Sequence, residues 1–511
     1  MAGLTRRNFM LGSAVAAAGV LMAGCSASGE GSGKASGSAV EWSQETDIVV
    51  VGAGTAGVVS AVTALEAGAS VTLIDKADFV GGISSACVQF CTPGSSLGLP
   101  QLFDGVEDSA DLLYEDMMRT SEDTADPTYL KILCDNAESA TEWLIDHGCE
   151  FKPALKMAEG RPGRGKYIYA STGEPITKML PMLEEQATIM LKTTLEEVIF
   201  DEAEGRVVGV GVLDKSGERA NIKAAKGVIL CTGMWHDDSL MMARHAPAAP
   251  AIVNEAAEVF AGMGMPYGPM TGEAIRAAQK IGAAVRHMDY VVPEPWYAPA
   301  ELMSQGIGVA GATRSVNQVM VDAAGKRFTD EGAGRGHCGE DVIRKADGLF
   351  FPVYDGHIVP SQANPPQEKL DEWVAAGHVA KGETLEELAA NMESLFGVPA
   401  ADFLATMTEY NGFCAAGEDA AFGKDPHYLV AFDQAPFYAG PKQTALQFYT
   451  HGGLDADENG AVRNIEGETI PGLFAAGMCA GGHLGRDTVS GAWQTNSVVF
   501  GRLAAAAAAA N

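Results

Sequence analysis

Three glycines and one carboxylate near the start of the sequence have the types and spacing of a dinucleotide-binding site. Gly52, Gly54 and Gly57 form a G-x-G-x-x-G motif, and Asp75 follows 18 residues after the last glycine. In this motif the first glycine makes the turn, the second lets a pyrophosphate approach the backbone, and the third lets a helix pack on a strand. Asp75 is expected to accept a hydrogen bond from the adenosine ribose.

The segments around these residues predict the elements that must hold them. Residues 47–51 are an apolar, β-branched run that predicts a buried parallel strand, 58–67 predict a helix of small residues, and 71–74 predict a second strand. The start of the helix would then offer unpaired N–H groups and the positive end of its dipole to phosphate.

Two later segments favour FAD over a nicotinamide. Residues 227–233 predict a strand that ends in Thr232 and Gly233, and residues 470–477 predict another that ends in Gly477. An alternating, β-meander-like region at 197–224 precedes the first of them. This spread over more than 400 residues resembles the two-dinucleotide-binding flavoprotein fold. We therefore expect an α/β protein with a Rossmann-like domain of that type and FAD as its cofactor.

Composition excludes several other classes of function. The 511 residues include 35 basic and 66 acidic ones, a formal charge of −31. That charge argues against nucleic acid and anionic lipid as partners, because both require a basic surface. The ten histidines have no metal-binding spacing, and the cysteines show neither C-x-x-C-H nor an iron–sulfur pattern, so we predict no metal site.

The first 25 residues predict an export signal. Arg6 and Arg7 precede a short apolar stretch at 11–23, which resembles a twin-arginine signal and is too short to span a bilayer, where about 20 residues are needed. Residues 22–25 resemble a lipobox with Cys25 as the lipidated residue, and the Gly/Ser-rich residues 26–46 predict a flexible linker. We expect an exported, extracytoplasmic protein anchored to the cell membrane by lipid.

From residue 47 to the end, the sequence resembles the FAD-dependent fumarate reductase and succinate dehydrogenase flavoproteins, above all the exported fumarate, urocanate and enoate reductases. Residues 325–335, GKRFTDEGAGR, carry the most specific likeness, a GKRFxxE pattern followed four residues later by arginine. The resemblance implies that Arg335 donates a proton after reduced flavin delivers hydride to an α,β-unsaturated acid. It also implies that His451 binds a substrate carboxylate and that Arg314 supplies protons from further away.

The motifs and the resemblance together give a set of residues expected to contact FAD. They are Gly52, Gly54, Thr55, Ala56, Gly57, Asp75, Lys76, Gly81, Gly82, Val198, Thr232, Gly233, Gly477 and Met478.

The sequence departs from the family pattern where protons are supplied and where substrate binds. Gly311 stands where the family has a relay glutamate, so proton supply is expected to use another acid, such as Glu331 or Glu301, or water. Glu294 stands where fumarate reductases have a histidine, and an acid there would repel a second substrate carboxylate.

The loop near the C-terminus departs as well. Thr488 occupies the register of an arginine that clamps the substrate carboxylate, and Arg486 is the nearest possible substitute. Trp296 and Tyr297 either line an aromatic pocket or serve only for packing. These departures favour a monocarboxylic enoate, one with an aromatic or heteroaromatic tail, or a neutral enone.

The same reasoning predicts the domain organisation and the partners. We expect an FAD domain at 47–288 and 452–511, interrupted by an α+β capping domain at 289–451 that carries Arg335. A separate cytochrome or FMN-carrying protein is expected to donate electrons, in a terminal reductase of anaerobic respiration. Two alternatives stay open: a 3-ketosteroid-type enone dehydrogenase or reductase that uses Tyr438 or Tyr449, and a flavin electron carrier without small-molecule turnover.

Overall fold

The computed structural model describes residues 40–94, 97–99, 107–153, 166–246, 268–303, 318–357 and 367–511. The chain divides into two compact units, residues 1–41 and 42–511, and every element described below belongs to the second. Within the described ranges, no helix combines the length and the apolar character that crossing a membrane requires.

The largest sheet is built on a parallel strand–helix–strand unit. β1 (Gln44–Val51) pairs in parallel with β2 (Val71–Ile74), and α1 (Thr55–Glu66) connects them. Ile48 and Val50 belong to one hydrophobic core, whereas Val49 and Val51 belong to another. Because alternate side chains of a strand point to opposite faces, β1 is buried on both faces, which explains its uninterrupted apolar sequence.

Further strands extend this unit into an eight-stranded sheet. Its order is β18 (Ala461–Arg463), β19 (Thr469–Ala475), β9 (Arg219–Leu230), β1, β2 and β6 (Thr188–Met190). The pairs from β19 to β6 are parallel, and β18 is antiparallel. β7 (Thr194–Asp201) and β8 (Arg206–Leu213) add an antiparallel extension on β9, as the alternating sequence at 197–224 predicts.

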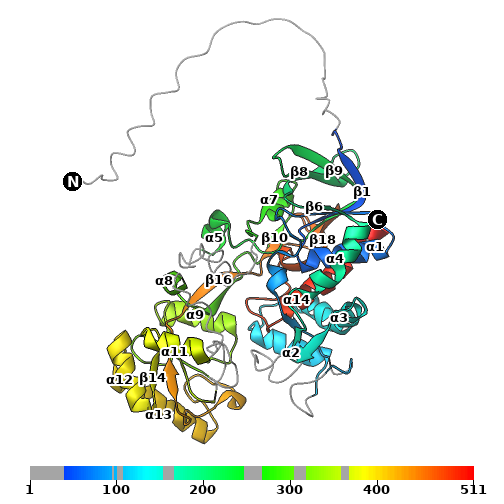
Figure 1. The fold of residues 1–511 in the computed structure, drawn as a ribbon. Helices are drawn as coiled ribbons and strands as arrows, with labels where there is room; N and C mark the ends of the chain where they lie inside the picture. Colours follow the sequence, from blue (N-terminus) through cyan, green and yellow to red (C-terminus); the bar gives the residue numbers. More distant parts are fainter. Residues whose placement is uncertain are drawn as a thin grey trace, which may run out of the picture. The chain divides into compact units, whose positions relative to one another are not determined.

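Helices of small residues pack tightly beside this sheet. α14 (Ala492–Ala510) lies against α1, and the two are neighbours in Figure 1, red beside blue. The Ser60 hydroxyl of α1 donates to the Gly501 carbonyl of α14 at 3.0 Å. α2 (Ala110–Thr120), α3 (Pro127–Asp146) and α4 (Glu174–Gln186) complete the group.

Smaller sheets bring distant segments together. The four-stranded antiparallel sheet has the order β12 (Val319–Val321), β13 (Phe351–Tyr354), β15 (Phe437–Ala439) and β14 (Ala380–Gly382). β11 (Val291–Tyr297) pairs with β16 (Thr444–Thr450), and β10 (Val285–Arg286) pairs with β17 (Gly453–Leu454). β3 (Gln89–Cys91), β5 (Lys166–Tyr169) and β4 (Phe151–Pro153) form a three-stranded sheet.

The remaining helices fall into two sets. α12 (Leu385–Phe396) and α13 (Ala400–Ala416) share a core with the four-stranded sheet and appear beside β14 in Figure 1. The other elements are α5 (Ser239–His245), α7 (Glu273–Gln279), α8 (Ala300–Met303), α9 (Arg335–Lys345), α11 (Gln367–Ala375) and the short 3₁₀ helices η2 (Gly82–Ala86), η5 (Pro426–Tyr428) and η6 (Gly477–Cys479). The predicted domain boundaries at 288 and 451 stay a prediction.

Candidate active site

The turn between β1 and α1 has the geometry that the glycine motif requires. Gly52 has a φ of +102°, and a Cβ there would lie 2.4 Å from the Cys231 carbonyl oxygen. A Cβ on Gly57 would lie 1.8 Å from the carbonyl oxygen of Gly52. The chain therefore passes too close to itself for any side chain, and α1 begins directly at the end of the strand. Its first residues, Thr55 and Ala56, line a cavity.

Asp75 is fixed at the end of β2. Its Oδ2 accepts from the Ala53 N–H at 2.6 Å, and its Oδ1 accepts from the Ala77 N–H at 2.8 Å. Burial raises the pKa of this carboxyl group, and these two backbone donors partly oppose the rise. Lys76 next to it bonds to Glu273 at 2.7 Å, and all three of these side chains line the cavity.

The structure brings most of the expected FAD contacts to this cavity. Eleven of them line it: Gly52, Gly54, Thr55, Ala56, Asp75, Lys76, Gly81, Gly82, Thr232, Gly233 and Met478. Gly57 and Gly477 lie behind its wall, where Gly477 lets η6 approach Ala56. Val198 does not line it either, because its side chain packs in the core beneath β7; Thr193 and Leu195 line the cavity in its place.

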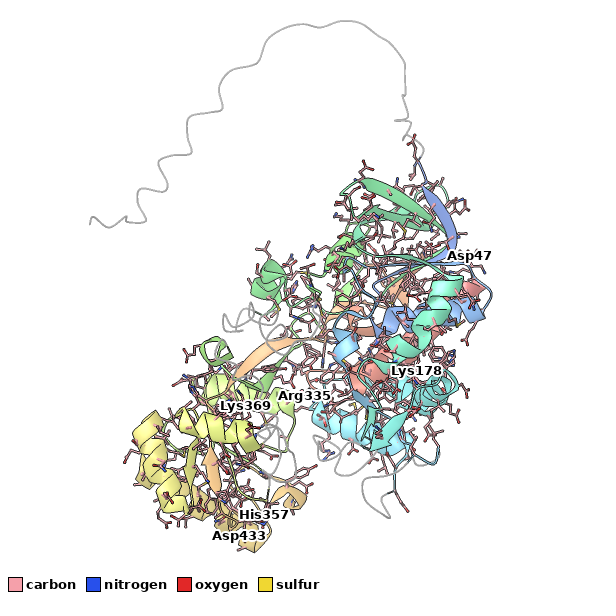
Figure 2. All side chains as sticks on the ribbon, viewed as in Figure 1. Asp47, Lys178, Arg335, His357, Lys369 and Asp433 are labelled. Carbon is pink, nitrogen blue, oxygen red and sulfur yellow. The ribbon has the colours of Figure 1, made fainter. Side chains whose placement is uncertain are left out.

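The cavity, of about 330 Å³, is continuous from the glycine turn to Arg335. Arg335, labelled in Figure 2, is the first residue of α9. It is only 2 % exposed. Asp487 accepts from the Gly336 N–H at 2.7 Å and so fixes the start of this helix. A Cβ on Gly334 or Gly336 would lie within 2.8 Å of that carboxylate, so both glycines are needed for the contact. The arginine thus projects from a rigid helix end.

Glu294 and Ser490 both hold the Arg335 guanidinium by hydrogen bonds. Its Nη1 donates to Glu294 Oε1 at 3.0 Å, and its Nη2 donates to the Ser490 hydroxyl. Glu294 is 1 % exposed, and its Oε2 accepts from the Tyr297 hydroxyl at 3.1 Å. Glu294 and Tyr297 line the cavity, whereas the side chain of Trp296 lies outside the part that the structure describes.

Aromatic rings form the neighbouring wall. The guanidinium of Arg335 lies 4.6 Å from the centroid of the Trp493 ring, which stacks on Tyr449 at 4.3 Å. Trp493 donates its indole N–H to Nε2 of His451 at 2.7 Å, and Nδ1 of His451 lies 2.7 Å from the Gly485 carbonyl oxygen. His451 is thus a neutral, Nδ1-protonated ring. Burial lowers its pKa to about 4, and Arg335 adds to this effect.

The other residues predicted to bind substrate lie elsewhere. Arg486 is exposed, bonds to Asp289 at 2.9 Å and does not line the cavity. Thr488 is buried beside Asp487 and does not line the cavity either. Arg314, Gly311 and the predicted lipidation site Cys25 fall outside the described residues.

Neither acid offered by the sequence as a proton source reaches Arg335. Glu331 is fully buried between Arg327 at 2.9 Å and Lys424 at 3.1 Å. Burial alone would raise the pKa of Glu331, but the two cations outweigh it and lower the pKa. Glu301 bonds to Lys442 at 2.9 Å on the surface. Glu294 is the acid that the structure places at the guanidinium.

Within the described part of the chain, one group of potential metal ligands lies away from this site. His357 lies between Asp355, 3.1 Å from its Nδ1, and Asp433, 3.6 Å from its Nε2, and the labels in Figure 2 place it far from Arg335. Since each carboxylate meets a different ring nitrogen, the group has the geometry of a histidine between two ion-pair partners. The absence of a metal site stays a prediction.

The residues along the cavity fit FAD. The start of α1 and the glycine turn can receive a pyrophosphate, and Asp75 can accept from a ribose hydroxyl. The cavity then continues beyond these groups to Arg335, which leaves room for a second ring system between them. These features define a flavoprotein with a dinucleotide site joined to a substrate site.

Comparison with known proteins agrees with this class. Residues 47–491 match the family model described as "FAD binding domain", so the chain belongs to that family and FAD is its cofactor. It is 29% identical over 484 residues to the urocanate reductase of Eggerthella lenta, covering 91% of this chain and 75% of the relative. It is 29% identical over 526 residues to the acrylate reductase flavoprotein subunit of Shewanella woodyi, covering 98% of each.

Among solved structures, the open conformation of a flavocytochrome c3 fumarate reductase has a TM-score of 0.66 and 26% identity, covering 92% of this chain and 79% of that one. The predicted resemblance to the fumarate reductase flavoproteins, the α/β fold and the FAD cofactor are confirmed, and the chain is an FAD-dependent oxidoreductase.

Sequence reasoning missed two residues that contact Arg335. Ser490 and Trp493 carry no motif of their own, and only the packing of the start of α14, with the residues just before it, against Arg335 reveals their contacts. Gln494 was missed as well; it lines the cavity and accepts from the Thr55 hydroxyl at 2.9 Å.

Proposed function

We propose that the chain is an exported, FAD-dependent reductase of the carbon–carbon double bond of an unsaturated acid, with Arg335 as the proton donor. The observation that carries this proposal is the single cavity that runs from the glycine turn to a buried, firmly held arginine. The names of the matched urocanate and acrylate reductases support the same reaction class.

The protein's own residues have separate tasks in this reaction. The residues that line the cavity from the glycine turn onward would hold FAD, which when reduced would supply a hydride for the β-carbon of the substrate. Negative charge then develops at the α-carbon, where the Arg335 guanidinium stabilises it and gives up a proton. Trp493 and Tyr449 form apolar walls beside the guanidinium, and an electrostatic interaction is stronger in such surroundings than in water.

The charges at the site favour a substrate with one carboxylate or none. Glu294 balances the positive charge of Arg335 at 3.0 Å, so a dicarboxylate would meet a nearly neutral pair rather than a free cation. Tyr297, Tyr449 and Trp493 line the same space and offer stacking surfaces. We infer an acrylate with an aromatic or heteroaromatic substituent.

The sequence supports a proposal for where the protein works and what supplies its electrons. The paired arginines at positions 6 and 7 and Cys25 support export and lipid anchoring outside the cytoplasm. A separate cytochrome or FMN-carrying protein would then supply electrons, as in a terminal reductase of anaerobic respiration. Residues 289–451 would act as a cap that closes over the substrate.

A neutral enone is the second candidate, supported by the tyrosines at the cavity. Tyr297 and Tyr449 line it and could polarise a ketone oxygen. Tyr438 is a poor candidate for this role, because it is buried in the four-stranded sheet and stacks on Tyr354 at 5.5 Å.

A substrate panel tests the proposal. The FAD-loaded protein from residue 26 onward is supplied with reduced viologen and assayed with fumarate, acrylate, urocanate, cinnamates and steroid enones. Turnover of an aryl acrylate well above fumarate supports the assigned class, and turnover of enones alone favours the second candidate. Bound, reducible FAD without turnover of any compound would contradict the reductase and favour an electron carrier.

A further inference from the structure

We propose that Glu294 returns a proton to Arg335 after each turnover, and that Tyr297 positions its carboxyl group for this task. The proposal rests on the proposed function of Arg335 as proton donor. It identifies a residue that replaces the proton source absent at Gly311.

The geometry gives a direct chain of hydrogen bonds. Arg335 Nη1 lies 3.0 Å from Glu294 Oε1, and the Tyr297 hydroxyl lies 3.1 Å from Glu294 Oε2. All three side chains line the cavity, while Arg335 and Glu294 are 2 % and 1 % exposed. Glu294 is therefore placed to return a proton that leaves the guanidinium.

The other described contacts of the guanidinium do not offer an acid that could return that proton. These contacts are the Ser490 hydroxyl and the rings of Trp493 and Tyr449. Near neutral pH none of these groups acts as an acid that gives up a proton and takes another from water. Among the described contacts of the guanidinium, Glu294 has the side chain that can do so. Glu331 and Glu301 are held by other cations, as described above.

The proton balance closes over one cycle. After the substrate β-carbon has received hydride, the α-carbon takes a proton from an Arg335 nitrogen, which leaves a neutral guanidine and a reduced substrate. The Glu294 carboxylate takes a proton from water that enters as product leaves, and passes it from its oxygen to the guanidine nitrogen. The site then again holds a guanidinium and a carboxylate, with one proton consumed from solvent.

A comparison of first and later turnovers tests this role. In Glu294→Gln the amide oxygen can still accept from Arg335, so the first turnover of pre-reduced enzyme should stay within about threefold of wild type. Later turnovers should slow about 100-fold, the usual size of general acid–base effects. A pH-indicator dye should show proton uptake lagging behind flavin reoxidation. Glu294→Asp keeps a carboxyl group and should restore steady turnover to within about tenfold of wild type.

Two controls separate this role from a structural one. Glu301→Gln makes the same chemical change in a surface ion pair and should leave both phases unchanged. Equal slowing of first and later turnovers in Glu294→Gln, or unchanged later turnovers, would overturn the proposal, as would failure of Glu294→Asp to recover. If Glu294→Gln does not retain FAD, the proposal is tested by the steady turnover and the proton uptake of Glu294→Asp. A wild-type protein that turns over no panel compound would instead overturn the proposed function itself, and this inference with it.

Discussion

Trp493 donates its indole N–H to His451 at 2.7 Å while the same ring lies 4.6 Å below the Arg335 guanidinium. Both nitrogens of His451 are thereby used, because Nδ1 bonds to the Gly485 carbonyl. In this arrangement the histidine positions the wall of the site. Its predicted contact with a substrate carboxylate would require Trp493 to move.

Replacing Trp493 by phenylalanine separates these two contacts. The ring under Arg335 remains, but Nε2 of His451 loses its donor in a buried position. We expect a loss of about 1–3 kcal/mol in the free energy of unfolding, the cost of an unsatisfied buried polar group. Urea unfolding measures this loss. Trp143→Phe is the matched control, since its indole N–H meets Glu66 at an exposed position, and its loss should be about 1 kcal/mol or less. Equal losses in the two variants would contradict a buried hydrogen bond between Trp493 and His451.

A second prediction concerns the glycine turn and its role in FAD binding. Gly57→Ala would place a Cβ 1.8 Å from the Gly52 carbonyl oxygen, so α1 must move away from β1. We expect loss of bound FAD, measured as the ratio of flavin to protein absorbance after purification. Gly412→Ala lies inside α13, where a Cβ meets nothing within 4 Å. It should keep FAD and gain about 0.5–1 kcal/mol of stability. Full FAD occupancy in Gly57→Ala would refute the role of this turn.

Local sequence patterns were sufficient to predict the framework of the site. The apolar run before Gly52, the helix of small residues and Asp75 are consecutive, so their order alone predicts the dinucleotide turn. Arg335 was found through the motif around it. Partners that meet only in the folded chain were not predictable in this way. Ser490 reaches Arg335 across 155 residues, and Arg486, predicted at the substrate, instead meets Asp289 on the surface.

A buried charge cluster next to the arginine-bearing segment gives a third prediction. Glu331 bonds to Arg327 and Lys424, and all three side chains are buried. Glu331→Gln would leave the buried Lys424 ammonium without its carboxylate partner, while Arg327 would keep Asp419 at 2.8 Å. Removing one partner of a buried ion pair should cost about 3–5 kcal/mol of unfolding free energy. Lys326→Met breaks an exposed pair with Asp402 and should change stability by about 1 kcal/mol or less. Chemical denaturation of both variants measures the difference, and a small loss in Glu331→Gln would contradict the assigned pairing.

The lowered pKa values of three buried histidines lead to a prediction of how the free energy of unfolding depends on pH. Burial lowers the pKa of His236, His451 and His483 to about 4 in the folded protein, whereas the ordinary value is about 6.5. The unfolded chain therefore binds more protons between these values, and the folded state loses stability as pH falls from about 6.5 to 4. Each histidine contributes on the order of 3 kcal/mol across that range. Urea unfolding from neutral to mildly acid pH should show this decline, with a shallower slope in His483→Asn. A stability that stays flat down to pH 5 would contradict it.

The measurement that tests the central claim is the anaerobic reoxidation of reduced FAD by an unsaturated substrate, followed by stopped flow in Arg335→Gln. We expect that FAD content stays normal and that reoxidation slows by about 10²–10⁴-fold, the contribution of a positioned proton donor. Arg344→Gln, on the exposed part of the same helix, should react at the wild-type rate. Reoxidation of Arg335→Gln at the wild-type rate would contradict the claim that this arginine completes the active site.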